Sequence, residues 1–220
     1  MTCFKIPGFI GAIIELAVFA AGSSALYLAV NQPNKIDPIT YYWCIFTVLT
    51  GLWESAYIIS HKQSVEISNR LVDMDLNVWT ERYSLSMLLP WNFFVIFYGE
   101  YGAFADREYM TNKDICSRLI EGTHAIFCGL FSLAAIILYY VGQFEAYNIT
   151  LSVAMGSQLM NSILYMGQYY IETKNKNSVN YNNSDFQLGT LWYKRPFMYV
   201  NLFWTIMPIY SITRQLYNTV

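Results

Sequence analysis

This chain of 220 residues has little charge, because only 13% of its residues are Asp, Glu, Lys or Arg. Soluble domains carry about 25%, so this chain has too few charges to cover a water-facing surface. The formal net charge of −2 provides no basic patch of the kind that nucleic-acid binding requires. The composition therefore argues against a nucleic-acid partner and indicates a membrane protein.

Histidine and paired cysteine are also scarce. Two histidines are too few ligands for the multi-histidine di-iron centre of a desaturase or hydroxylase. The four cysteines have no CxxC spacing and are expected to be small apolar residues within helices. The one Glu-x-x-His motif, from Glu121 to His124, lacks the second such motif and the further carboxylates of a di-iron bundle. We therefore expect neither a metal nor an organic cofactor.

Apolar residues (55%) and aromatic residues (18%) are abundant. A spanning helix needs about 20 mostly apolar residues. Five segments meet this requirement: 8–30, 41–61, 119–141, 147–171 and 197–216. The first is predicted to be a retained span rather than a signal peptide, because no cleavage site of small residues follows its long apolar run. We expect an all-α, polytopic transmembrane bundle of about five helices, forming a single domain over residues 1–220.

Two long connections complete this organisation. The 62–118 connection begins with polar and charged residues and continues in an apolar insert, 83–104, which is interrupted by Pro90, Asn92 and Glu100. The insert is therefore predicted to be a re-entrant or interfacial segment that protein covers. The 172–195 segment is rich in Asn, Ser and Lys and is predicted to be a flexible polar loop. The excess of Lys and Arg predicts that the N-terminus and both connections lie on the cytoplasmic side.

Three acidic residues lie within predicted spans: Glu15, Glu54 and Glu121. An ionisable group in a span costs about 2.5 to 3.5 kcal/mol on insertion scales and marks function by default. Glu15 equally fits a role in helix packing. Helical spacing places Tyr57 on the face of Glu54, with His61 returning to that face at the span end, and it places His124 on the face of Glu121.

A carboxylic acid buried in hydrocarbon stays protonated at neutral pH. It is then a usable general acid for an apolar substrate. Faces of Trp, Tyr and Phe around such an acid stabilise a developing carbocation. The residues thus suggest acid-initiated carbocation chemistry on a lipid.

Four stretches in the second half of the chain carry a family resemblance. They are EYGAFADREYM, the segment from Asp114 through Glu121 to Gly129 and Ser132, GSQLMNSILY, and NLFWTIMP. From about Glu100 to Leu216 they resemble, in order, the motifs of the emopamil-binding-protein family, which is also called the EXPERA domain and includes the sterol Δ8–Δ7 isomerases.

The resemblance implies a five-helix bundle in the endoplasmic reticulum membrane. It also implies a reaction in which an acidic residue protonates a ring alkene and a neighbouring base removes a proton from the adjacent carbon. Glu121, Asn201 and Trp204 occupy matching family positions. In the second span, Glu54 stands where the sterol isomerases have a histidine, and Ile58 stands where they have a glutamate.

We therefore expect a membrane-embedded isomerase that rearranges an isoprenoid substrate, a sterol or a terpenoid, through a carbocation-like intermediate. Glu54 and Glu121 are the expected proton donor and acceptor, Asn201 would orient a carboxyl group, and Trp204 would face the cation. The residues expected to bind substrate are Trp53, Tyr57, Tyr101, Asp106, Arg107, His124, Gln158, Asn161 and Tyr165.

Three alternatives stay open at this point. The first is an enzyme of secondary metabolism that rearranges an epoxide or alkene of a terpenoid or prenylated alkaloid. The second is a sterol- or lipid-binding membrane protein without catalysis. The third is a structural or transport-accessory membrane protein. The expected partners are the bilayer and an apolar small molecule, and a homodimer is compatible with the sequence.

Overall fold

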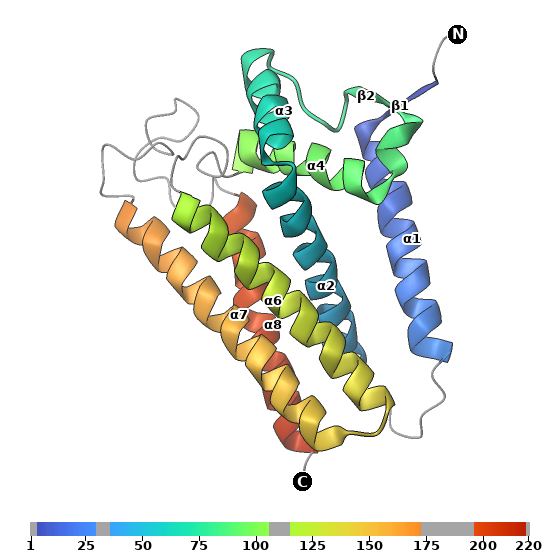
Figure 1. Cartoon of the computed structure of the whole chain (residues 1–220), viewed down its shortest axis with the longest axis vertical. Coiled ribbons are helices and arrows are strands. Elements are labelled where there is room, and N and C mark those ends of the chain that lie inside the picture. The colour runs from blue at the N-terminus through green and yellow to red at the C-terminus, as the bar shows by residue number, and fades with distance from the viewer. Residues whose placement is uncertain (1–3, 30–35, 106–114, 173–195, 219–220) are drawn as a thin grey trace. The chain divides into compact units, whose positions relative to one another are not determined.

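The computed structural model describes residues 4–29, 36–105, 115–172 and 196–218. These residues form seven α-helices and one pair of three-residue strands (Figure 1). The helices are α1 (Gly8–Ala29), α2 (Pro38–Ile59), α3 (His61–Asp73), α4 (Pro90–Glu100), α6 (Ile115–Tyr140), α7 (Phe144–Glu172) and α8 (Pro196–Asn218). The all-α prediction is confirmed for these residues. Helices α1, α2, α6, α7 and α8 overlap the five predicted spans, and α2 ends at Ile59, before the end of the predicted 41–61 span. The predicted polar loop lies outside the described residues, except for its first residue.

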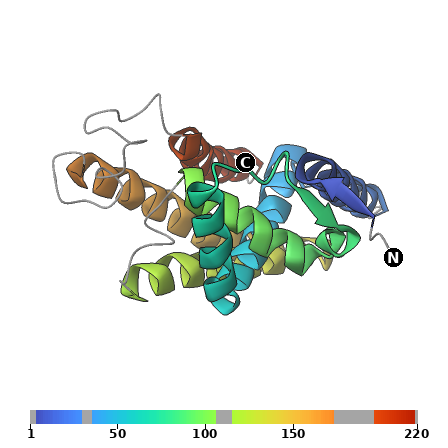
Figure 2. The same cartoon turned by 90° about the horizontal axis from the view of Figure 1, so that it is seen from above.

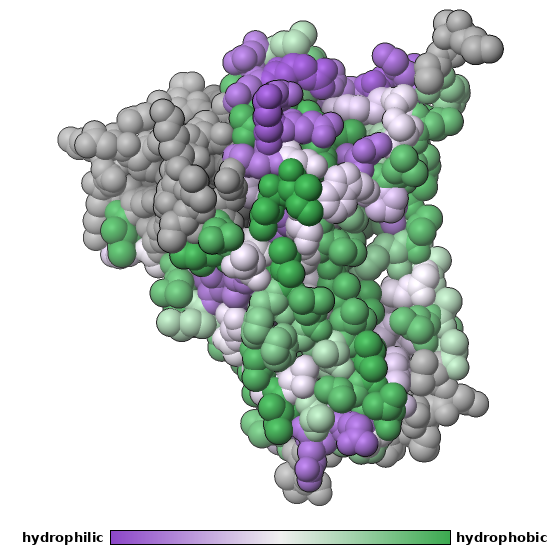
Figure 3. Space-filling view, viewed as in Figure 1, coloured by the Kyte–Doolittle hydropathy of each residue, from purple (hydrophilic) through white to green (hydrophobic). Residues whose placement is uncertain are grey.

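Three helices in the described parts of the chain are long and apolar enough to cross a membrane. They are α1, α2 and the Leu119–Tyr140 part of α6. On α1, Leu16 and Val18 are 56% and 66% exposed, as expected for side chains that face lipid. Figure 3 shows apolar residues along the long helices and hydrophilic residues gathered over α3. These helices identify a membrane protein.

The chain packs as two compact units, which are described separately. Unit 1 comprises Met1–Asn31 and Trp53–Leu119, and unit 2 comprises Gln32–Leu52 and Ile120–Val220. The boundary at Trp53 falls within α2, so the first turns of this helix belong to unit 2 and its last turns to unit 1.

In unit 1, the first turn of α1 is fixed by backbone contacts with the segment that precedes the second strand. The N–H groups of Gly8 and Phe9 donate to the carbonyls of Glu81 and Trp79 at 2.9 and 3.0 Å. The first N–H groups of a helix have no partner within it, so these bonds satisfy two of them. Just before them, strand β1 (Lys5–Pro7) pairs antiparallel with β2 (Arg82–Ser84).

The 62–118 connection is predicted to be a long loop with an apolar insert, but its described part contains most of α3 and all of α4. Helix α3 packs against α4, and Figures 1 and 2 show α4 passing beside it. Between β2 and α4 lies the 3₁₀ turn η1 (Leu85–Leu88), and α4 continues into a π-helical turn, η2 (Tyr101–Ala105). Short π-helical turns often occur at functional sites.

The three residues that interrupt the apolar insert all have structural roles in unit 1. Pro90 is the first residue of α4, where its missing N–H costs nothing. The amide of Asn92 donates to the Ser86 carbonyl at 2.9 Å. The Glu100 carboxylate accepts the Val78 N–H at 2.9 Å. These polar residues therefore organise the insert.

In unit 2, α6 and α7 are joined by a tight turn. Gly142 adopts a φ of 78°, which is the left-handed conformation that commonly ends a helix. Its N–H donates to the Tyr139 carbonyl at 3.0 Å, and the Gln143 N–H donates to the Leu138 carbonyl at 2.9 Å. Helix α7 then packs along α8, and the two views show them side by side (Figures 1 and 2).

Candidate functional site

A carboxyl group at the end of α2 lies within an aromatic cluster of unit 1. The Tyr98 hydroxyl on α4 donates a hydrogen bond to Oε1 of Glu54. The Tyr98 ring stacks on Tyr57, with centroids 4.5 Å apart and an interplanar angle of 14°. Tyr57 and Tyr98 are 1% and 9% exposed, whereas Glu54 is half-buried. An acidic group is thus held against buried aromatic rings.

Two further predicted residues join this cluster. Trp53 and Tyr101 pack against Tyr57 and Tyr98, and the Tyr101 ring is 5.7 Å from that of Tyr98. Trp53 also meets Phe94 edge-to-face at 5.9 Å. Each such aromatic pair stabilises by about 0.5 to 1.5 kcal/mol beyond its buried area. Of the predicted site residues, the structure brings Trp53, Glu54, Tyr57 and Tyr101 together.

His61, the last residue of the predicted 41–61 span, also contacts the cluster, although helix α2 does not reach it. Helix α2 ends at Ile59 and α3 begins at His61. The His61 ring nevertheless meets Tyr57 edge-to-face at 5.0 Å. Helical spacing predicts that His61 lies on the same side as Glu54 and Tyr57. His61 does lie against Tyr57, but the junction between α2 and α3, and not one continuous helix, brings it there.

Tyr98 is the main residue that sequence reasoning missed. A signal was available, because Phe94, Tyr98 and Tyr101 recur at positions i, i+4 and i+7, which share one helix face. This pattern lies in the 83–104 insert, whose polar interruptions predict a re-entrant or interfacial segment, and the structure forms helix α4 there. Tyr98 lies on α4, outside the three candidate spans, and burial raises its pKa well above the usual value. Tyr98 therefore remains a neutral O–H donor.

Unit 2 contains the second predicted carboxylate in a different setting. The Asn161 amide on α7 donates to Oε2 of Glu121 at 3.1 Å. One turn along α6, the His124 Nε2 lies 3.3 Å from the Cys128 sulfur. Glu121 and Asn161 lie in two different predicted spans, and the structure pairs them.

The other predicted residues of unit 2 lie on α7 and α8. Gln158 is 1% exposed; its Oε1 accepts the Trp43 indole N–H, and its amide donates to Thr47, both at 2.9 Å. Trp204 meets Trp43 edge-to-face at 4.8 Å. Asn201 uses its backbone carbonyl to accept the Ser162 hydroxyl at 3.0 Å, and Tyr165 is half-buried on α7.

Glu54 and Glu121 belong to different units, so their pairing as proton donor and acceptor stays a hypothesis. Asp106 and Arg107 lie outside the described residues.

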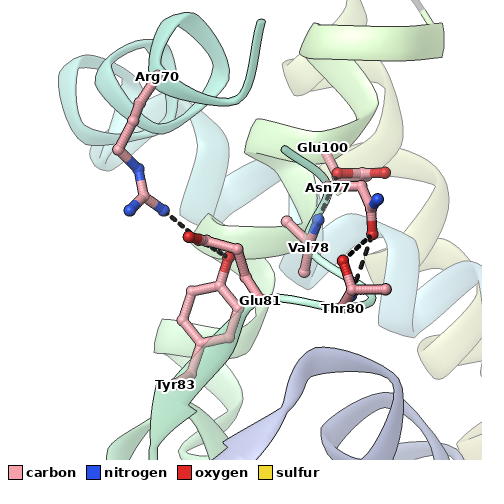
Figure 4. A network of polar contacts seen from close by, with 7 residues as sticks. All are labelled: Arg70, Asn77, Val78, Thr80, Glu81, Tyr83 and Glu100. Atoms are coloured by element: carbon pink, nitrogen blue, oxygen red, sulfur yellow. Dashed lines mark hydrogen bonds and ion pairs between the residues drawn. The ribbon is translucent and has the colours of Figure 1, made fainter. Parts of the chain in front are cut away.

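A polar network lies at the end of unit 1 that carries α3 (Figure 4). The Arg70 guanidinium pairs with Glu81, which also accepts the Tyr83 hydroxyl at 3.0 Å. Asn77 caps the next turn by accepting the Thr80 N–H at 3.0 Å. Glu100 accepts the Val78 N–H and a side-chain hydrogen bond from Trp79. These bonds hold the 77–81 segment against α3 through Arg70 and against α4 through Glu100.

Glu100 makes the stability of this network depend on pH. Burial raises the pKa of its carboxyl group above the usual 4.5, although the bonds from Val78 and Trp79 oppose the rise. The folded state therefore favours the protonated form, so the stability from Glu100 is present below its unfolded pKa and is lost as pH rises through its folded pKa. We expect the Tm of Glu100→Gln, relative to wild type, to increase with pH across this window.

Thermal unfolding of the detergent-solubilised chain over a pH series measures this difference. Glu66→Gln is the matched control, because Glu66 is exposed on α3. A Tm difference between Glu100→Gln and wild type that stays constant with pH would contradict the expectation.

No protein-family model, no curated protein and no solved structure matches this chain.

Proposed function

We propose that the chain is an integral membrane isomerase that rearranges an isoprenoid lipid by protonating it, with Glu54 as the proton donor. The observation that carries the proposal is the hydrogen bond from Tyr98 to Glu54 within the aromatic cluster of unit 1. Because Tyr98 donates to Oε1, that oxygen acts as the carbonyl oxygen of the protonated acid. The acidic proton is then carried by Oε2, the oxygen from which it is transferred.

The aromatic residues supply the second requirement of this chemistry. Protonation of an alkene forms a new C–H bond at one carbon and a cation at the other. The electron-rich face of an aromatic ring attracts such a cation by about 2 kcal/mol or more when water is excluded. Trp53 and Tyr101, which are half-buried at the edge of the cluster, would supply such faces. Loss of a proton from the adjacent carbon restores an alkene in a shifted position, so the reaction balances without a cofactor.

Glu121 is the proposed proton acceptor, and Asn161 holds it by donating to Oε2. Asn201 would orient a carboxyl group, and Trp204 would offer a further aromatic face. We further propose that α7 and α8 also cross the bilayer, which completes five spans in the endoplasmic reticulum membrane.

The opening of a terpenoid epoxide is the second candidate reaction. It also begins with a protonated carboxylic acid, and Glu54 with its Tyr98 partner supplies one. The two reactions differ in where the proton goes, because an epoxide takes it on oxygen and an alkene takes it on carbon.

Lipid profiling tests the proposal. The chain is expressed in a yeast strain deficient in Δ8–Δ7 sterol isomerase, and its sterols and isoprenoids are compared with those of the empty strain. We expect Δ8 sterols to fall and Δ7 sterols to appear. Continued accumulation of Δ8 sterols, with the protein shown to be folded in the membrane, would contradict the sterol reaction. If the amounts of all isoprenoids also stay unchanged, the proposal of an enzyme is given up in favour of a lipid-binding protein without catalysis.

A further inference from the structure

The two short strands of unit 1 form a ribbon that carries two positively charged side chains on one face. Strand β1 pairs antiparallel with β2, and Lys5 lies opposite Ser84. Two positions along the ribbon, Pro7 lies opposite Arg82. Side chains alternate between the two faces of a strand, so these four residues share one face and the buried Ile6 lies on the other. Because Lys5 and Arg82 are both exposed, the face that carries them is the outer face of the ribbon.

Neither of these cations pairs with an acidic side chain within the described parts of the chain. Glu81, which directly precedes Arg82, pairs with Arg70 and accepts the hydroxyl of Tyr83, a residue of the inner face (Figure 4). Lys5 and Arg82 are diagonal neighbours in the ribbon, a position that sets side chains about 7 to 8 Å apart. Two long side chains at this spacing can reach one anion between them.

The donors on the outer face suit a phosphate group. A guanidinium donates two parallel N–H bonds to phosphate oxygens, and a lysine ammonium binds phosphate as a point charge. The Ser84 hydroxyl, on the same face, lies 2.6 Å from the Ser86 hydroxyl. One of the two hydroxyl protons joins this pair, so the other is available to an oxygen of a ligand.

The position of the ribbon indicates that the phosphate belongs to a lipid. Helix α1, a candidate span, begins at Gly8, directly after β1. The ribbon therefore lies where the chain enters the bilayer, and its outer face continues the lipid-facing surface of α1. Apolar side chains flank it, since Phe4, Phe9 and Leu85 are 69%, 46% and 50% exposed. A phospholipid matches both features, whereas a free phosphate ion matches only the cations.

We propose that the outer face of the ribbon binds an anionic phospholipid of the leaflet at which α1 begins, with the lipid phosphate between Lys5 and Arg82. A phospholipid whose headgroup also carries a quaternary ammonium fits less well, because the same two cations repel that group. The proposal is independent of Glu54 and of the reaction proposed for it.

Photo-crosslinking of the full chain in detergent tests the site. The probe is a phosphatidylglycerol that carries a diazirine near the top of one acyl chain, and the labelled peptides are identified by mass spectrometry. We expect labelling within residues 4–9 and 82–89. Unlabelled phosphatidylglycerol should compete about fivefold better than phosphatidylcholine, and inorganic phosphate at the same concentration should not compete. Added salt should weaken the labelling, because it screens exposed charges.

Three variants test the two cations. Lys5→Gln and Arg82→Gln should each reduce labelling of these segments about fivefold, and the double variant about 30-fold, the usual contribution of cations near an anionic lipid surface. Arg82→Lys keeps the charge and should lose less than Arg82→Gln. Lys62→Gln is the matched control, because Lys62 is an exposed lysine on α3, outside the ribbon, and it should leave this labelling unchanged.

The proposal is overturned if the probe labels neither segment, or if the double variant and Lys62→Gln behave alike. Equal competition by phosphatidylcholine would overturn it as well, because any phospholipid would then suffice. Competition by inorganic phosphate would assign the outer face to a free anion in place of a lipid.

Discussion

Replacing Glu54 with Gln is expected to reduce turnover of the isoprenoid substrate by about 10²- to 10⁴-fold, the usual contribution of a general acid. Glutamine keeps the oxygen that accepts the Tyr98 hydroxyl, so the aromatic cluster of unit 1 should stay intact. What it removes is the transferable proton. Product formation by membranes containing equal amounts of each variant measures the effect.

Glu15→Gln is the matched control, because Glu15 is a half-buried glutamate in another candidate span. It should leave turnover unchanged. Tyr98→Phe keeps the ring that stacks on Tyr57 and loses only the hydroxyl bond, so a smaller loss of about tenfold is expected. Full activity of Glu54→Gln would contradict the assignment of the proton donor.

Replacing Gly8 with Ala is expected to destabilise unit 1 by about 3 kcal/mol, the upper part of the range for overpacking a tight site. A Cβ at this position would lie 1.9 Å from the Val78 carbonyl oxygen. The neighbour is backbone, and the Gly8 N–H is bonded to Glu81, so neither side moves away easily. Thermal unfolding in detergent should show a clear fall in Tm.

Gly22→Ala, in the same helix, provides the comparison. Among the described residues, no atom beyond the neighbouring helix backbone lies within 4 Å of the Cβ that this change adds. Alanine also favours helix by up to about 1 kcal/mol over glycine, so the Tm should stay the same or rise slightly. Equal Tm values for Gly8→Ala and wild type would mean that α1 does not approach the Val78 carbonyl as closely as described.

The sequence predicted the helices well, because long apolar runs admit few other structures in a membrane. It also predicted that Trp53, Glu54 and Tyr57 would share a site, because neighbouring positions on one helix set their spacing. The pairing of Glu121 with Asn161 agrees with the rule that polar groups within a membrane find partners. Apolarity sufficient for a span is found for α1, α2 and α6, whereas α7 and α8 carry more polar residues.

The missed features depend on contacts between distant segments. Tyr98 reaches Glu54 from 44 positions away, and only the packing of α4 brings the two together. Pro90, Asn92 and Glu100 suggested a broken segment, yet each has a partner or a helix position that suits it. The ribbon of β1 and β2 likewise joins segments that are far apart in the sequence, which composition alone does not specify.

The most direct test of the central claim follows the proton itself. Membranes containing the chain are incubated with a Δ8 sterol in deuterated water, and the product is analysed by mass spectrometry. Because the Glu54 proton exchanges with solvent, the account predicts a Δ7 product that carries deuterium on carbon, formed by wild type and by Glu15→Gln but not by Glu54→Gln. Product without solvent deuterium, or equal incorporation by Glu54→Gln, would contradict it.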